Sequence, residues 1–341
     1  MSTNFESEIR SQGAVLAARS ANSKELAAQT KDLWRDASYL LVAARGSSDN
    51  AALYFQYLVG QHARRVVALA TPSLFENGGS LNLEGAGVLA ISQSGRSPGI
   101  VDVVNDARRQ RRPVVGVTNN NDSPLAQNCD LLIGLEAGSE VAIASTKTFT
   151  ATAQALAQIA SALGETELAD IDRFASYVGG VVDFALNADL PLELLNQVRG
   201  FTVVGRGVGM AAAAEISLKI REVTGIKAEA YSAADFVHGP IGVDGEDAAL
   251  MIVATDEMSD ELIAKLLSDC SAKGMKTVVV RSPNRSAFSA NGEIVLPEQV
   301  PNWLTPIGHV VVGQVLALRL GTLRGRPIDT APGLAKVTLT A

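Results

Sequence analysis

Three charged side chains of one segment, Glu215, Lys219 and Glu222, have types and spacing that can carry proton transfer. They lie in the Ala-rich stretch 211–225 at steps of four and three residues, so a helix there places all three on one face. Taken alone, this spacing favours a solvated Glu–Lys face. The stretch directly follows a Gly-rich strand end, however, where parallel sheets form ligand pockets, so a carboxylate there can serve as a positioned base.

A second candidate group for acid–base chemistry is His238, which a Gly-Pro dipeptide follows. Gly-Pro marks a loop, and a loop histidine titrates near neutral pH. A lone histidine is more often a packed or surface residue than a catalyst, so His238 alone decides nothing. His62 lies in helix-like sequence and His309 in an apolar helical stretch, and we interpret both as structural.

Hydroxyl-bearing side chains gather at three strand or helix ends of the first half. Residues 92–98 read Ser-Gln-Ser-Gly-Arg-Ser-Pro and follow an apolar, strand-like run. Pro98 suits the first position of a helix and Ser97 the cap before it, where free N–H groups and the helix dipole favour an anion. An ordinary Ser-capped turn is the alternative for this motif alone. Residues 47–48 end a neighbouring strand and residues 145–148 begin another helix, so the three segments together favour a phosphate pocket.

The corresponding segment of the second half is acidic. Residues 254–261 read Ala-Thr-Asp-Glu-Met-Ser-Asp-Glu, and their carboxylates would repel a phosphate. We therefore expect one phosphate site per chain.

These motifs sit among apolar runs typical of strands that are buried on both faces of a parallel sheet. Runs in the first half begin near residues 38, 65, 87, 113 and 130, and segments of helical composition lie between several of them, which predicts an open α/β sheet. Four runs of the second half, near residues 201, 248, 276 and 292, repeat first-half runs in the same order at an offset of roughly 160 residues. We expect two copies of one α/β unit, joined near residues 180–194.

Composition narrows the class of protein. The 341-residue chain is 47% hydrophobic and 5% aromatic, and its net charge of −7 disfavours a general nucleic-acid binder, which needs a basic surface. Two cysteines and three scattered histidines are too few for a disulfide framework or a Cys-rich zinc site, so we expect no metal and no cofactor. The N-terminus lacks an apolar signal stretch, and the longest apolar runs, such as the one at His309, are too short to span a bilayer. We expect a soluble cytoplasmic protein that binds neither nucleic acid nor membrane.

Together, the motifs resemble the sugar isomerase (SIS) domain family over nearly the whole chain. Besides the Glu-Lys-Glu face, the matching segments are Ser-Gln-Ser-Gly at 92–95, Ala-Ser-Thr-Lys at 144–147, Ala-Glu-Ala-Tyr at 228–231, His-Gly-Pro at 238–240 and Gly-Leu-Ala-Lys-Val-Thr at 333–338. The likeness is greatest to double-SIS enzymes acting on amino-sugar 6-phosphates, namely the isomerase half of glucosamine-6-phosphate synthase and the stand-alone SIS-type glucosamine-6-phosphate deaminases. The resemblance implies two tandem SIS units, each a parallel sheet flanked by helices in a flavodoxin-like three-layer α/β/α arrangement.

The resemblance also implies a division of the chain and a role for each site residue. We expect an N-terminal helical segment at 1–37, SIS domains at 38–180 and 195–325, and a C-terminal tail at 326–341 that covers the site. Glu222 matches the family's base, which moves a proton between C2 and C1, and His238 matches the ring-opening residue. Lys219 and Glu215 match polar residues that line the sugar, and Lys336 matches a lysine of the tail. The side chains implied to hold the phosphate and sugar are Ser47, Ser48, Ser92, Gln93, Ser94, Ser97 and Ser145.

In the synthases the ring-opening histidine enters from the partner subunit, so a homodimer with shared active sites is implied. The synthases also carry a glutaminase domain with an N-terminal cysteine nucleophile, and a chain whose SIS-like pattern starts by about residue 38 is expected to have no room for one. The Arg-Gly-Ser-Ser-Asp and Ser-Gly-Arg-Ser-Pro patterns look more like the deaminases. The leading hypothesis is conversion of glucosamine 6-phosphate to fructose 6-phosphate and ammonia through an enediol or enolamine.

Three alternatives stay open at this point. An aldose–ketose phosphosugar isomerase and a fructosamine-6-phosphate deglycase would reuse the same phosphate loop and base, and Lys227, where many relatives have His, leaves the fine specificity open. A non-catalytic sugar-phosphate sensor is the alternative from another class. Residues 1–37 are too short and too acidic for a helix-turn-helix module, and a sensor has no need of both a base and a ring opener.

Overall fold

The computed structural model describes residues 2–331, 333 and 335–336. Contacts divide the chain into two compact units, each discontinuous in sequence. The N-terminal unit contains residues 14–140, 147–172 and 335–336, and the C-terminal unit contains residues 2–13, 141–146, 173–331 and 333. The segment 1–37 is thus shared between the two units. The domain boundaries predicted from the sequence, 38–180 and 195–325, differ from those of the two compact units and stay a prediction.

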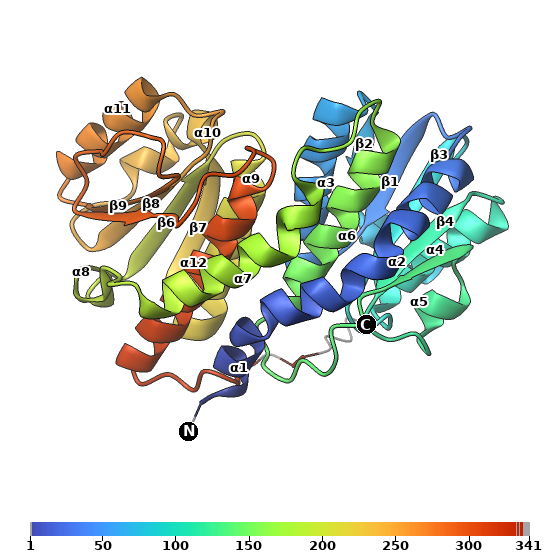
Figure 1. Cartoon of the computed structure of the whole chain (residues 1–341), viewed down its shortest axis with the longest axis horizontal. Coiled ribbons are helices and arrows are strands. Elements are labelled where there is room, and N and C mark those ends of the chain that lie inside the picture. The colour runs from blue at the N-terminus through green and yellow to red at the C-terminus, as the bar shows by residue number, and fades with distance from the viewer. Residues whose placement is uncertain (1, 332, 334, 337–341) are drawn as a thin grey trace. The chain divides into compact units, whose positions relative to one another are not determined.

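The N-terminal unit is built on a parallel five-stranded sheet of order β2-β1-β3-β4-β5 (Figure 1). Its strands are β1 Tyr39–Ala43, β2 Val67–Leu69, β3 Ala86–Ile91, β4 Val114–Thr118 and β5 Leu131–Gly134. Its helices are α2 Gln12–Leu33, α3 Ser47–His62, α4 Pro98–Arg109, α5 Pro124–Gln127 and α6 Lys147–Leu163, with short turns η1 Pro72–Leu74, η2 Glu76–Gly78 and η3 Ile171–Arg173. Every residue of β3 and β4 is buried, which is why these strands are unbroken apolar runs in the sequence.

The C-terminal unit repeats this topology, with a parallel sheet of order β10-β9-β8-β6-β7 (Figure 1). Its strands are β6 Gly200–Gly205, β7 Lys227–Ser232, β8 Ala248–Ala254, β9 Lys276–Arg281 and β10 Gly292–Val295. Its helices are α1 Asn4–Arg10, α7 Phe174–Asn187, α8 Leu192–Asn196, α9 Gly209–Lys219, α10 Ala233–Phe236, α11 Asp260–Ser271 and α12 Thr305–Leu323, with a π-helical turn η4 Ile220–Thr224 and a short turn η5 Pro240–Gly242. The predicted duplication of one α/β unit, with helices flanking each parallel sheet, is therefore confirmed.

Two parts of the C-terminal unit differ from the sequence-based expectation. The predicted link at 180–194 is largely helical, because it contains the second half of α7 and the start of α8. Strand β7, which pairs with β6 as β2 pairs with β1, was not expected as a strand. It lies at the edge of its sheet and exposes Lys227 and Glu229, so it lacks the continuous apolar run of a central strand.

Helix α12 corrects the expectation that no apolar run is long enough for a bilayer. Among the described residues, this 19-residue helix is long and apolar enough to cross a membrane, but 83% of its most apolar stretch is buried inside the protein. It packs against α7 and α9, and its apolar character all round is that of a core helix.

Candidate active site

The carboxyl edge of the N-terminal sheet brings the hydroxyl-rich segments of that unit together. Strands β1 and β3 pair directly, with Ala43 opposite Ala90, although the chain leaves β1 towards β2 and leaves β3 towards β4. Such a reversal of strand order leaves a crevice outside the strand ends, where ligands bind in open α/β sheets. Ser47 and Ser48 follow β1, and residues 92–97 follow β3, so both segments lie at this point.

Residues 92–97 form a turn that ends at the start of α4. Ser97 occupies the N-cap position and Pro98 the first helical position, as predicted, but the Ser97 side chain makes no capping hydrogen bond. Its Oγ lies 3.1 Å from Oγ of Ser92, a side chain that is almost completely buried. Ser94 Oγ accepts a hydrogen bond from the Arg96 N–H at 3.2 Å. Because no side chain caps α4, the positive end of its dipole stays available to an anion.

Gly95 fixes the shape of this loop. It has a φ of +64°, and a Cβ placed there would come within 2.0 Å of Ser123 Oγ and 2.9 Å of Thr118 Oγ1. The Thr118 hydroxyl donates to the Gln93 carbonyl at 3.2 Å, and the Leu125 N–H donates to the Gly95 carbonyl at 3.1 Å. Residues at the end of β4 and after it therefore bind the backbone of the loop at 92–97 and pack against it, so only glycine fits at position 95.

The second helix N-terminus at this edge belongs to α3, which begins at Ser47. Its N-cap is Gly46, with a φ of +62° and no side chain to cap the helix. Arg45, which the sequence analysis did not select, is half-exposed here and forms an ion pair with Glu76 at 3.0 Å. Burial raises the pKa of the nearby Asp49 carboxyl, and the positive charge of Arg45 opposes that rise. Arg45 lies two residues after the end of β1, and this place at a strand end is the sequence signal that could have identified it.

Lys336 of the C-terminal tail has a defined partner within the N-terminal unit. Its Nζ lies 2.8 Å from Oε2 of Glu140, whose side chain is completely buried. The same carboxylate accepts hydrogen bonds from Thr148 at the start of α6, from the backbone N–H at 3.1 Å and from Oγ1 at 2.6 Å. Glu140 is a second residue that the sequence analysis missed. Ser145, in the segment 141–146, is half-buried, and Leu334, Val337 and Thr338 of the tail motif lie outside the described residues.

Glu215, Lys219 and Glu222 share one face of α9 and η4, as predicted, but the alternative of a solvated face is wrong. Glu215 and Lys219 have fully buried side chains, and that of Glu222 is 18% exposed. Lys219 Nζ lies 2.5 Å from Glu222 Oε2 and 3.4 Å from Glu215 Oε1. Glu222 sits in a π-helical turn, a local change of helix period often found at functional sites. The arrangement holds a nearly buried carboxylate against a buried cation.

The three histidines have different surroundings. His238 lies in an exposed loop after α10, and no hydrogen bond within the described residues joins its ring to the Glu215–Lys219–Glu222 cluster. His309 is fully buried in α12, with its ring nitrogens 2.8 and 3.0 Å from the carbonyl oxygens of Thr305 and Val280. Burial lowers the pKa of the His309 imidazole, and these carbonyl contacts oppose the shift.

Comparison with known proteins places these features in a family. The SIS domain profile matches residues 34–162 and 194–299, which together make up more than half of the chain. This chain belongs to the SIS domain family. The first matched segment carries residues 92–97, and the second carries Glu222 and His238.

Several SIS proteins of known name resemble the chain along most of its length. It is 30% identical over 315 residues to glutamine–fructose-6-phosphate aminotransferase [isomerizing] of Thermus thermophilus, an alignment that covers 89% of this chain and 52% of the relative. The chain thus spans about half the length of the curated relatives it matches. The C-terminal domain of glucosamine-fructose-6-phosphate aminotransferase from Francisella tularensis has the same fold, with a TM-score of 0.84, 20% identity and coverage of 97% and 98% of the two chains. Glucosamine-6-phosphate deaminase from Thermotoga maritima matches with a TM-score of 0.81, 20% identity and coverage of 99% and 100%.

Proposed function

We propose that this chain is a phosphosugar isomerase of the SIS family that converts glucosamine 6-phosphate and water to fructose 6-phosphate and ammonia. The observation that carries the proposal is the Glu222 carboxylate, nearly buried and 2.5 Å from Lys219 Nζ. Proton transfer beside a carbonyl needs a carboxylate of fixed position, and this contact supplies one. The name of the isomerizing aminotransferases, which contains fructose 6-phosphate, supports a hexose 6-phosphate as the substrate.

In this proposal, the substrate phosphate binds at the carboxyl edge of the N-terminal sheet. Two helix N-termini without side-chain caps, those of α3 and α4, and the hydroxyls of Ser48, Ser92, Ser94 and Ser97 supply hydrogen-bond donors. Ser47, Gln93 and Ser145 complete the proposed set. Arg45 adds a positive charge, which its ion pair with Glu76 holds in place.

The proposed reaction begins with the opening of the pyranose ring, in which His238 transfers a proton to the ring oxygen. Glu222 then removes the C2 proton of the open aldose and returns it to C1, which gives the C2 imine of the ketose through an enolamine. Water adds to the imine carbon, and ammonia leaves to give fructose 6-phosphate. Lys219 orients Glu222, Glu215 fixes Lys219, and Lys336 with its tail limits the access of water.

The homodimer is part of the same proposal. His238 is exposed and follows the short helix α10, a position from which it can reach a partner subunit. A chain that is monomeric at assay concentration and fully active would contradict a shared site.

The test is ammonia release from glucosamine 6-phosphate, coupled to detection of fructose 6-phosphate. Wild type is compared with Glu222→Gln and with Glu261→Gln, a control that neutralises an exposed carboxylate of α11. We expect turnover in wild type and in Glu261→Gln, and a loss of roughly a hundred- to ten-thousandfold in Glu222→Gln, because general-base catalysis supplies about 10²–10⁴-fold.

Other outcomes separate the remaining possibilities. If wild type releases no ammonia from any hexosamine 6-phosphate, the deaminase reaction is wrong. Interconversion of plain hexose phosphates, abolished by Glu222→Gln, would then assign an aldose–ketose isomerase. Binding of sugar phosphate by both proteins without turnover by either would assign a sensor.

A further inference from the structure

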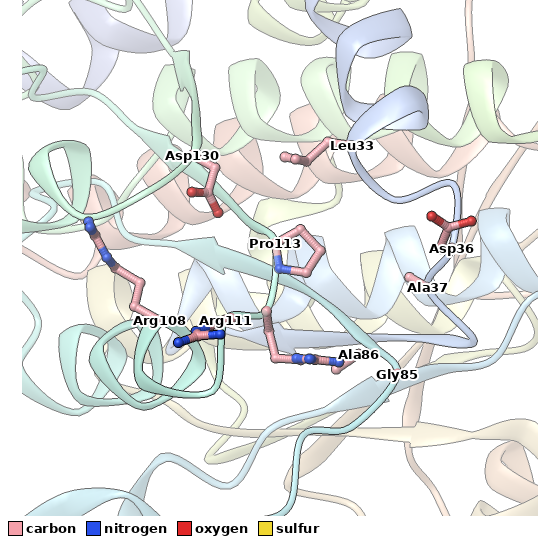
Figure 2. A pocket seen from close by; sticks show the side chains of 10 residues that line it. Leu33, Asp36, Ala37, Gly85, Ala86, Arg108, Arg111, Pro113 and Asp130 are labelled. Atoms are coloured by element: carbon pink, nitrogen blue, oxygen red, sulfur yellow. The ribbon is translucent and has the colours of Figure 1, made fainter.

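A pocket of about 580 Å³ lies at the opposite, amino edge of the N-terminal sheet (Figure 2). Its walls come from the residues that lead into the strands: Ala37 precedes β1, Ala86 begins β3, Pro113 precedes β4 and Asp130 precedes β5. The six residues of β3, at about 3.3 Å each, separate this edge from residues 92–97 by roughly 20 Å. The pocket is therefore distinct from the proposed phosphate loop, and its volume lies within the range of small-molecule sites.

Three arginines give the pocket its chemistry. Arg108 is in the last turn of α4, and Arg111 and Arg112 follow the end of the helix; Figure 2 shows Arg108 and Arg111 beside Pro113 and Asp130. A cation in the last helical turn complements the helix dipole, which is a sufficient reason for Arg108. It does not account for Arg111 and Arg112, which lie beyond the helix.

The backbone at Arg111 makes this position unusual. Arg111 has a φ of +56°, and its N–H donates to the Arg108 carbonyl while the Arg112 N–H donates to the Ala107 carbonyl. These two bonds form a Schellman motif, in which the left-handed residue is usually glycine because a side chain is disfavoured there. Arg111 adopts this left-handed conformation although it is unfavourable for any residue with a side chain. An arginine at a position that favours glycine points to a role for the guanidinium.

The acidic side chains of the pocket do not neutralise these arginines. Among the described residues, no ion pair joins Arg108, Arg111 or Arg112 to Asp36 or Asp130. Asp130 instead accepts a hydrogen bond from the Val114 N–H at 2.8 Å. Arg111 makes no side-chain hydrogen bond with any described residue, whereas Arg109, outside the pocket, is paired with Asp106 at 2.5 Å. Arg108 donates to Asn128 Oδ1 at 3.4 Å and Arg112 Nε donates to the Gln110 carbonyl at 2.9 Å, so Arg111 presents the uncommitted guanidinium group.

We propose that this pocket binds a small phosphorylated molecule through Arg111, with Arg108 and Arg112 on the same anion. Guanidinium groups match the oxygens of a phosphate in pairs of hydrogen bonds, and the volume leaves room for the organic part of the ligand. The site does not depend on the proposed reaction, since it lies at the other edge of the sheet.

Calorimetric titration with inorganic pyrophosphate tests the proposal on the full chain. Every protein in this titration also carries Ser94→Ala and Ser97→Ala, which minimise the contribution of residues 92–97 to the measured pyrophosphate binding. Arg111→Gly removes the guanidinium and at the same time supplies the residue that a Schellman motif favours, so this variant keeps its fold and we expect its unfolding temperature to rise. The matched control is Arg64→Gly, because Arg64 also has a positive φ, of +50°, follows helix α3 and lies outside the pocket.

We expect Arg111→Gly to weaken pyrophosphate binding roughly ten- to a hundredfold, the effect of losing charge-assisted hydrogen bonds, and Arg64→Gly to change it less than twofold. Equal affinities of the two variants would overturn the proposal. A second measurement locates the ligand: phenylglyoxal modifies accessible arginines, and pyrophosphate should protect residues 108–112, mapped by mass spectrometry. Protection confined to Arg45 and Arg96 would place the anion at the phosphate loop and reject this pocket.

Discussion

The carboxyl edges of the two sheets share one topology but present different side chains to a helix N-terminus. After β3, the chain brings Ser92 and Ser94 to the start of α4, where Ser97 makes no capping hydrogen bond. After β8, the equivalent loop is acidic, and Ser259 caps α11 by accepting from the Leu262 N–H at 3.3 Å. The N-terminus of α4 is therefore open to an anion, whereas the N-terminus of α11 is capped by the Ser259 side chain.

The C-terminal unit also fills its second helix N-terminus. Glu257, from the loop after β8, lies against Gly207, and its Oε1 is 3.5 Å from the Val208 N–H at the start of α9. Arg285 donates to the carbonyls of Thr255 and Met258 at 2.8 and 2.6 Å and closes the loop further. The Glu257 carboxylate and the Arg285 guanidinium thus bind backbone groups at the carboxyl edge of the second sheet. Because the helix N-termini are open in the N-terminal unit and occupied in the C-terminal unit, the duplicated fold is expected to provide one phosphate site and not two.

The largest effect is expected at the buried Glu215–Lys219–Glu222 cluster of the C-terminal unit. Lys219→Met removes the buried cation that contacts both Glu215 and Glu222, so we expect a loss of about 3–5 kcal/mol in the free energy of unfolding. Lys265→Met removes an exposed i,i+4 pair with Asp269 and should cost below about 0.5 kcal/mol. Urea denaturation measures both. Equal losses would show that the cluster is not buried in solution.

A smaller difference should separate two glycines at the carboxyl edges of the two sheets, Gly95 after β3 and Gly207 after β6. Gly95→Ala forces a Cβ against Ser123 Oγ in a left-handed backbone, and we expect a loss of about 3 kcal/mol, with weaker binding of glucosamine 6-phosphate. Gly207, with a φ of +55°, faces the flexible side chain of Glu257, which can move aside, so Gly207→Ala should cost only about 1–2 kcal/mol. The reverse order, measured by denaturation, would contradict the rigid contact at Gly95.

The smallest effect concerns the two N-cap serines. Ser259→Ala removes a capping bond and should cost about 1 kcal/mol in unfolding free energy without changing the KM for glucosamine 6-phosphate. Ser97→Ala removes no cap, so stability should change by less than about 0.5 kcal/mol, while KM rises roughly tenfold through the loss of one phosphate contact. If Ser97→Ala costs as much stability as Ser259→Ala and leaves KM unchanged, Ser97 is an ordinary cap.

Much of the fold could be predicted from the sequence, because central parallel strands are buried on both faces and must be apolar throughout. Strands β3 and β8 and their repetition in order follow from that requirement alone. The edge strand β7 could not be predicted in this way, since one side of it meets solvent and its charges resemble those of a loop. The helical segment 1–37 was predicted as helix, but its division between two units depends on long-range packing that no local pattern records.

For the candidate site, the sequence by itself determined which side chains share a helix face and which residues follow a strand. It also determined that Pro98 begins a helix, since these are properties of local period and backbone preference. Tertiary structure decided the burial of Glu215 and Lys219, because α12, almost a hundred residues further along the chain, packs against α9 and η4. It also turned the Ser97 hydroxyl towards Ser92, joined Lys336 to Glu140 and collected three arginines around one pocket. The Ser97–Ser92 contact spans only five residues and depends on the shape of the loop. The other features depend on contacts between residues distant in sequence, and the spacing of residues along the chain does not predict the energies of such contacts.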